Sequence, residues 1–190
     1  MEILIKDKKY IGQCNALSYI YYKRIFKVNI FEDLENLRKS LINISKNDKK
    51  EQDISDFYKV LTKLIYILIY TKKQDVLEIF EKWSQKLEIQ DLSEDLIDET
   101  IEIYLESFLD EETAQELDKI PGDSNKKSIF PEHEFLKMCL DYGLSTEDLK
   151  NLTYIDVVKI FLSSYAERKE EKTMKFKEAT QADWDRLASL

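Results

Sequence analysis

Glycine and proline are very scarce in this sequence. Only three glycines and two prolines occur in 190 residues. All-β folds and loops that wrap phosphate groups use glycine freely, so its scarcity favours helices. Hydrophobic residues make up 43% of the chain and charged residues 35%, and the length is sufficient for a core of its own. The composition therefore predicts a soluble, mainly α-helical protein.

Histidine and cysteine are scarce as well, which argues against an enzyme or a metal protein. The single histidine, His133, has no second histidine near it, and no Cys-x-x-Cys pair occurs. Catalytic sites combine several titratable groups, so we expect no enzymatic activity, no cofactor and no metal. His133 is then an exposed residue in the first turn of a helix. Cys14 and Cys139 are expected to be free thiols that act as small apolar residues.

No targeting or membrane-spanning segment is recognisable. The first residues, MEILIKDKK, do not combine a positive segment with a following apolar stretch, so we expect no signal peptide and an intracellular protein. The longest uncharged part of the most apolar region, Leu64–Thr71, is far shorter than the roughly 18 residues of a membrane span. We therefore expect no membrane partner.

The most apolar stretch, Ile54–Tyr70, is the expected centre of the fold. Its apolar residues recur at the i, i+3, i+4 and i+7 spacing of a helix face, and Lys59 and Lys63 mark a narrow edge that we expect to face solvent. A helix that is apolar nearly all round is usually buried. One alternative stays open: the part of this face around Ile67 and Tyr70 forms an interface between copies in a homo-oligomer.

Weaker patterns place further elements around this helix. The expected β-hairpin has strands at residues 2–6 and 10–14 and a turn at residues 7–9. Asn15, Asn29 and Ser93 are candidate helix caps. The other expected helices cover residues 16–26, 30–44, 74–87, 93–109, 131–140, 145–152 and 153–165, and a last one begins at 180. In the helix over 93–109 we expect Leu105 to face inward, and Tyr165 likewise in the helix over 153–165.

Both prolines lie in one stretch, residues 119–131, which also holds several loop-forming residues. We interpret it as a linker. The expected organisation is a hairpin plus helical body at residues 1–118, the linker at 119–131, and a small all-α unit at 132–190.

Negative charge is concentrated in the middle of the chain. Residues 51–130 carry 9 basic and 20 acidic groups. Glu94, Asp98 and Glu102 have i, i+4, i+8 spacing, so they lie on one face of a helix. Such a row can bind a divalent cation or serve acid–base chemistry, but it is far more commonly a solvated face. The remaining interpretation is a docking surface for a basic partner.

A helix-turn-helix around Gly143 is the one pattern that points to nucleic acid. Its second helix begins with Glu147 and Asp148, which would meet DNA phosphates badly. We therefore expect no nucleic-acid partner and interpret Gly143 as a helix C-cap.

Trp184 lies near the end of the sequence in a short expected helix with Leu187. A segment this short cannot bury a tryptophan by itself, so it either folds back on the body or docks on another protein. Tryptophan is a preferred interface anchor. Trp184, Leu187 and Leu144, together with the row Glu94, Asp98 and Glu102, are the expected partner-binding residues.

Two regions, one near each end, carry a resemblance to a known family. The first comprises the hairpin ILIKDKKY and the segments CNALSYI and IFEDL, at residues 3–10, 14–20 and 30–34. The second comprises YGLS, LKNLT, a helix ending in Tyr165, and ATQAD, with the three lettered segments at residues 142–145, 149–153 and 179–183. Together they cover roughly half of the chain and are moderately specific patterns of small and apolar residues. They resemble tail assembly chaperones from phages and prophages of Gram-positive hosts.

The resemblance implies a non-enzymatic helper of tail morphogenesis in the host cytoplasm. Such proteins bind the tape-measure protein, keep its long hydrophobic helices soluble, and recruit tail-tube subunits through their distal part. In many of them a programmed ribosomal frameshift adds that part. The acidic stretch at residues 88–118 does not match the family pattern. Two other functions stay open: a structural protein retained in the tail, and an acidic inhibitor or adaptor that binds a basic partner.

Overall fold

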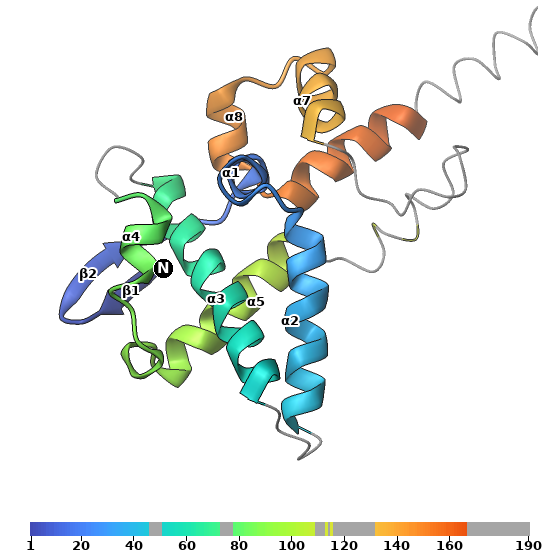
Figure 1. Ribbon diagram of the computed structural model, residues 1–190. Coiled ribbons are helices and arrows are strands. Elements are labelled where there is room, and N and C mark those ends of the chain that lie inside the picture. The colour runs from blue at the N-terminus through green and yellow to red at the C-terminus, as the bar shows by residue number, and fades with distance from the viewer. Residues whose placement is uncertain (46–50, 73–77, 109–112, 114, 116–131, 167–190) are drawn as a thin grey trace, which may run out of the picture.

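A computed structural model describes residues 1–45, 51–72, 78–108, 113, 115 and 132–166. This part of the chain is mainly helical and begins with a two-stranded antiparallel hairpin (Figure 1), as the sequence predicts. The elements are β1 (Glu2–Ile5), β2 (Lys8–Ile11), α1 (Ala16–Phe26), α2 (Ile30–Ser45), α3 (Glu51–Lys72), α4 (Phe80–Ser84), the short 3₁₀ helix η1 (Ile89–Asp91), α5 (Glu94–Phe108), α7 (Glu132–Asp141) and α8 (Thr146–Asn151). A further helix spans residues 154–166.

The hairpin is confirmed, but its predicted turn at residues 7–9 is wrong. The strands are joined by Lys6 and Asp7, whose φ angles are 48° and 62°. Two-residue turns with both central residues in the left-handed region match the right-handed twist of the strands, and this fixes the register. The register places Ile3 and Ile5 on the face that packs against the helices, where they are 0% and 5% exposed.

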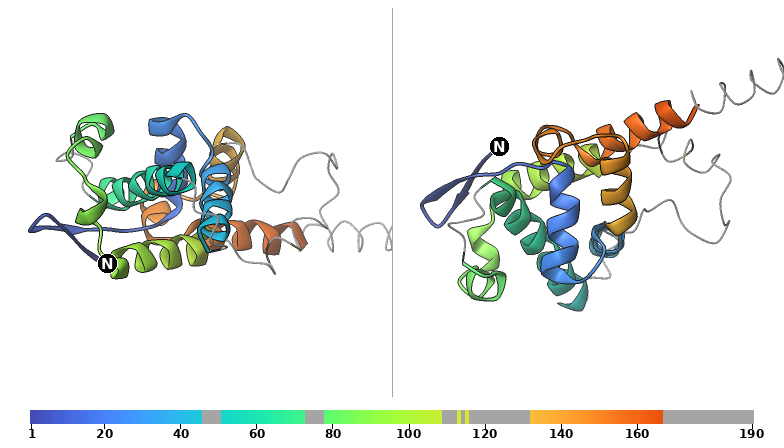
Figure 2. Two further views of the ribbon diagram at one scale, coloured as in Figure 1. Left: turned by 60° about the horizontal axis from the view of Figure 1, so that its bottom comes forward. Right: turned by 90° about the horizontal axis from the view of Figure 1, so that it is seen from above.

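α3 is the central helix, with α1, α2 and α5 packed around it (Figures 1 and 2). Leu64, Ile67 and Leu68 are completely buried, which confirms the predicted core helix. Ile67 belongs to the core of a single chain, whereas an interface between copies around Tyr70 stays a prediction. Tyr70 is half-buried and stacks on Tyr66, with 5.8 Å between ring centroids. No helix among the described residues has the length and apolar character needed to cross a bilayer.

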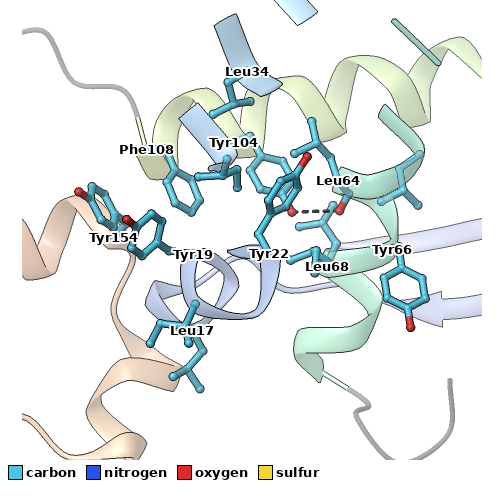
Figure 3. Packing of buried hydrophobic residues seen from close by; sticks show 14 of the residues in the cluster. Leu17, Tyr19, Tyr22, Leu34, Leu64, Tyr66, Leu68, Tyr104, Phe108 and Tyr154 are labelled. Atoms are coloured by element: carbon cyan, nitrogen blue, oxygen red, sulfur yellow. Dashed lines mark hydrogen bonds between the residues drawn. The ribbon is translucent and has the colours of Figure 1, made fainter. Parts of the chain in front are cut away.

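Aromatic rings connect the first helix of the chain to its last described helices. The Tyr19 ring lies 5.3 Å from Phe135 and 5.1 Å from Tyr154, measured between centroids. Tyr154 also stacks on Phe108 of α5 at 5.3 Å (Figure 3). Tyr104, one turn before Phe108, donates its hydroxyl to the carbonyl of Leu64 at 2.9 Å. Residues from α1, α3, α5, α7 and the helix over 154–166 therefore share one continuous hydrophobic cluster.

Backbone hydrogen bonds reinforce this connection at the start of α1. The Ala16 N–H donates to the carbonyl of Leu152 at 2.7 Å, and the Asn15 side-chain amide donates to the carbonyl of Lys150 at 3.0 Å. Asn15 also caps α1, because its side-chain oxygen accepts the N–H of Leu17. The division into two units stays a prediction, and its linker at 119–131 lies outside the described residues.

The helix predicted at residues 74–87 is much shorter than expected. α4 begins only at Phe80, because Ile79 is extended, with φ −55° and ψ 144°. The carbonyl of Glu78 accepts the hydroxyl of Tyr66 at 2.9 Å, and such a tertiary bond holds the segment before α4 out of a helix. Trp83 confirms the predicted apolar face, because it is buried with its ring 5.3 Å from Tyr66. The first part of the predicted helix, residues 74–77, lies outside the described residues.

Two residues predicted to face inward are partly exposed. Leu105 is 45% exposed, because the buried residues of α5 lie along one side of the helix that does not include it. These residues are Leu96, Thr100, Tyr104, Ser107 and Phe108. Tyr165 is 39% exposed, and it lies in the last described turn of a helix that projects away from the rest of the described chain (Figure 1).

Gly143 ends α7 in the left-handed conformation that the sequence predicts, with φ +71°. The N–H of Leu144 donates to the carbonyl of Cys139 and that of Gly143 to Leu140, both at 2.9 Å. This is the hydrogen-bond pattern of a Schellman motif. The motif turns the chain from α7 into α8.

Replacing Gly143 with alanine is expected to lower the free energy of unfolding by about 1–2 kcal/mol, the cost of a Cβ in the left-handed region. A Cβ at this position meets no atom within 4 Å, so the loss of stability reports the backbone conformation and not a steric clash. Urea unfolding measures it. Gly143→Asn is the matched control and should lose less, because asparagine tolerates this conformation. Equal losses for the two variants would contradict the assignment to backbone strain.

Candidate functional site

The predicted row of carboxylates lies on the outer face of α5. Ser93 starts the helix by accepting the N–H of Leu96 at 3.2 Å, and the buried stripe of α5 fixes which face points outward. Glu94, Asp98 and Glu102 are all exposed, which confirms a solvated face. Within the described part of the chain, no lysine or arginine forms an ion pair with any of the three. As far as the described residues show, this face is negative, and it can attract a basic partner.

A shallow depression lies between the start of β1 and the middle of α5. Its lining consists of Met1, Glu2, Glu99, Glu102, Ile103 and Glu106. Glu102 thus joins the predicted row to this depression, whereas Glu94 and Asp98 lie outside the lining. The positive group in the lining is the amino group of Met1, which donates to the carbonyl of Gly12 at 3.1 Å. Four carboxylates and one exposed edge of the hairpin therefore meet at one place.

The apolar partner-binding residues are less well supported. Leu144 is partly buried against the core, and its backbone caps α7, so it has a structural role. Its binding role stays a prediction. Trp184 and Leu187 lie outside the described residues.

A buried polar network was not anticipated from the sequence. The hydroxyl of Tyr22 and the ammonium of Lys63 both donate to Oδ2 of Asp33, at 2.6 and 2.7 Å. The side chains of Asp33 and Lys63 are only 10% and 13% exposed, so the prediction that Lys63 faces solvent is wrong. Lys63 is held inward by this ion pair and by the ring of Phe26, whose centroid lies 5.6 Å from its nitrogen. Burial and the adjacent Asp33 carboxylate raise the pKa of Tyr22 above its ordinary value, so Tyr22 remains a donor.

The network lies at one end of a polar groove between α2 and α3. The groove is lined by Asp33, Asn36, Lys39, Ser40, Asn43, Asp53, Asp56, Lys59, Val60 and Lys63. Its charges are mixed and partly satisfied internally, as where Asn43 donates to Asp53 at 3.0 Å. One signal for the network was present in the sequence: Asp33 has helical spacing with the apolar residues Ile30, Leu34 and Leu37, so it lies on the inner face of α2.

The described part of the chain offers little for catalysis or metal binding. It contains no group of three His, Cys, Asp or Glu residues arranged to hold a metal ion. His133 is exposed in the first turn of α7, as predicted. Cys14 and Cys139 are free thiols, also as predicted. Burial raises the pKa of each thiol to about 11, although hydrogen bonds from Ser107 and Ser18 partly offset this at Cys14. Neither cysteine therefore carries the thiolate of a reactive residue at neutral pH.

The sequence and the structure were compared with protein families, with curated proteins and with solved structures. None of the three comparisons gave a match. The resemblance to tail assembly chaperones therefore stays a prediction.

Proposed function

We propose that this chain is a non-enzymatic tail assembly chaperone of a phage or prophage. In the host cytoplasm it binds the tape-measure protein and recruits tail-tube subunits. One observation supports this most directly: the two regions that carry the family resemblance pack against each other. Asn15 and Ala16 of the first region donate hydrogen bonds to Lys150 and Leu152 of the second. The resemblance thus concerns one connected part of the fold.

The surfaces available for partners fit a protein that holds two of them. Leu140 of α7 is 74% exposed, and Tyr165 of the last described helix is partly exposed, so the distal helices offer apolar surface. The body at residues 1–118 offers the acidic face of α5. Tape-measure helices would lie in apolar grooves between helices of the body. Tube subunits would bind the segment 132–190, which includes Trp184 and Leu187.

Co-expression with a tape-measure fragment and a tail-tube protein tests this proposal. We expect the full chain to keep the tape-measure fragment in the soluble fraction and to retain tube protein in a pull-down. Trp184→Ala combined with Leu187→Ala should reduce tube capture at least tenfold and leave the tape-measure fragment soluble. Ile79→Ala, which alters an apolar residue that is 61% exposed elsewhere, is the control and should change neither.

An insoluble tape-measure fragment in the presence of the full chain would contradict the proposal. If Trp184→Ala with Leu187→Ala reduces binding of both partners equally, the assignment of the two partners to different parts of the chain is wrong. Detection of the chain in purified particles by mass spectrometry would favour the alternative of a structural tail component.

The exposed carboxylates of α5 support a second candidate, an acidic adaptor for a basic protein. In that case capture of the basic partner falls steeply between low and high salt. Binding of tape-measure helices through apolar grooves is much less sensitive to salt, so the same pull-down at two ionic strengths separates the two functions.

A further inference from the structure

Among the described residues, no strand pairs with the edge of β1 that faces away from β2. Met1 and Gly12 exchange both backbone hydrogen bonds, at 3.0 and 3.1 Å. Bonded and non-bonded pairs alternate along an antiparallel ladder, so Ile3 is the next residue bonded to β2. The backbone N–H and C=O groups of Glu2 and Leu4 therefore point away from β2.

These outward groups have no partner within the described residues. Neither the N–H nor the C=O group of Glu2 or Leu4 takes part in a hydrogen bond there. The Leu4 side chain is 59% exposed, and the Glu2 side chain pairs with Lys9 on the outer face of the hairpin at 3.1 Å. An exposed, partly apolar strand edge is a template on which another chain can form a strand.

Carboxylates border this edge because the start of β1 lies near α5. At one end of β1, Glu2 shares the depression with Glu99, Glu102 and Glu106. At the other end, Lys6 in the turn pairs with Asp91, just before α5, at 3.0 Å. Figure 2 shows β1 on the side of the hairpin that is nearer to α5. No lysine or arginine occurs in α5, so the α5 side of a strand added to β1 lies next to carboxylates. The lysines on the hairpin side, Lys6 and Lys9, are each paired with an acidic residue.

We propose that β1 takes up an extended, lysine- or arginine-containing segment of a partner protein as a third strand. The backbone groups of Glu2 and Leu4 bind the segment, and Glu99, Glu102 and Glu106 bind its basic side chains. A second copy of this chain is a poor occupant, because its net charge is −9 and its own acidic helix accompanies its hairpin. The proposal does not depend on a role in tail assembly.

Dye-labelled peptides test the proposal on the full chain. The probe has about eight residues that alternate valine and lysine, which favours an extended strand. One control peptide replaces lysine with glutamate, and a second keeps the lysines but replaces valine with glycine. Fluorescence anisotropy should show saturable binding of the valine–lysine peptide and none of the glutamate peptide. The glycine–lysine peptide should bind at least tenfold more weakly, and added salt should weaken all binding.

Proline substitutions test the role of the backbone. Leu4→Pro removes an outward N–H without removing a hydrogen bond of the hairpin itself, because proline is tolerated on edge strands. It should weaken binding of the probe at least tenfold. Ile11→Pro makes the same change on the outer edge of β2 without altering a charge, since Ile11 is the non-bonded partner of Glu2. This matched control should change the affinity less than twofold.

Charge substitutions test the role of α5 without altering the hairpin. Glu99→Gln with Glu102→Gln should weaken binding about five- to tenfold. Glu94→Gln with Asp98→Asn changes the net charge equally on the same helix but outside the depression, and should weaken binding less than twofold. Far-UV circular dichroism checks that each variant keeps its fold. If Leu4→Pro disturbs the fold, the proposal is tested by comparing the two double variants of α5.

Several results would overturn the proposal. Equal effects of Leu4→Pro and Ile11→Pro, or equal affinity for the valine–lysine and glycine–lysine peptides, would exclude strand addition. If the Glu99/Glu102 variant and the Glu94/Asp98 variant weaken binding equally, the depression is not where the basic side chains bind. Self-association of the full chain that Leu4→Pro abolishes in sedimentation would assign the edge to a second copy instead.

Discussion

A chain that ends at residue 121 is expected not to fold. The described residues beyond that point contribute Cys139, Tyr154 and five buried Phe, Leu and Val side chains to the core: Phe135, Leu149, Val157, Val158 and Phe161. Burial of each of these five contributes about 1.5–3 kcal/mol, so together they contribute about 8–15 kcal/mol. This equals the roughly 5–15 kcal/mol by which whole domains are stable. The truncation also exposes Tyr19 and leaves the Ala16 N–H without its acceptor.

Circular dichroism and urea unfolding of this shortened chain measure the effect, and we expect low helicity, aggregation and no cooperative transition. The control is the full chain with a protease site inserted between Lys126 and Lys127. After cleavage the two fragments should stay associated in gel filtration and keep the helicity of the intact protein. Cooperative unfolding of the shortened chain would show that residues 1–121 form a domain that does not need the distal helices.

Asp33→Ala is expected to lower the free energy of unfolding by about 3–5 kcal/mol, the typical result of removing one partner of a buried ion pair. The substitution leaves the Lys63 ammonium nearly buried without a counter-charge, and it removes the acceptor of the Tyr22 hydroxyl. A loss of this size is a large fraction of the total stability of a domain. Urea unfolding of the full chain measures it.

Glu35→Ala is the matched control, because Glu35 pairs with Arg38 on the exposed side of the same helix. Its unfolding midpoint should change little, since exposed pairs contribute little to stability. A second variant, Asp33→Leu with Lys63→Met, removes both charges and should recover part of the lost stability. If Asp33→Ala has no larger effect than Glu35→Ala, the buried network does not stabilise the fold.

Local signals predicted most of the helices. The hydrogen bonds that cap the helices at Asn15, Ser93 and Gly143 join residues at most five positions apart, so the sequence around each of them contains the whole motif. The prediction failed where a contact with a residue distant in sequence determines the local structure. The start of α4 depends on a bond from Tyr66, and the inward orientation of Lys63 depends on Asp33 of another helix.

The same distinction applies to the candidate site. The spacing of Glu94, Asp98 and Glu102 was sufficient to place them on one exposed face. That Glu2 lies beside Glu102 could not be inferred, because the two belong to opposite ends of the body and meet only through the tertiary fold. The inner position of Asp33 was readable from its helical spacing, but its partners Tyr22 and Lys63 were not.

The hydrogen bonds from Asn15 and Ala16 to Lys150 and Leu152 also set an order of events during synthesis. A ribosome makes α1 long before it makes the carbonyl groups that complete the start of that helix. Until then the aromatic side of α1 around Tyr19 lacks its final neighbours. Most of the chain must therefore be synthesised before α1 can make its native contacts. Pairing of segments so distant in sequence slows folding, because the entropy of closing the long loop opposes each productive encounter.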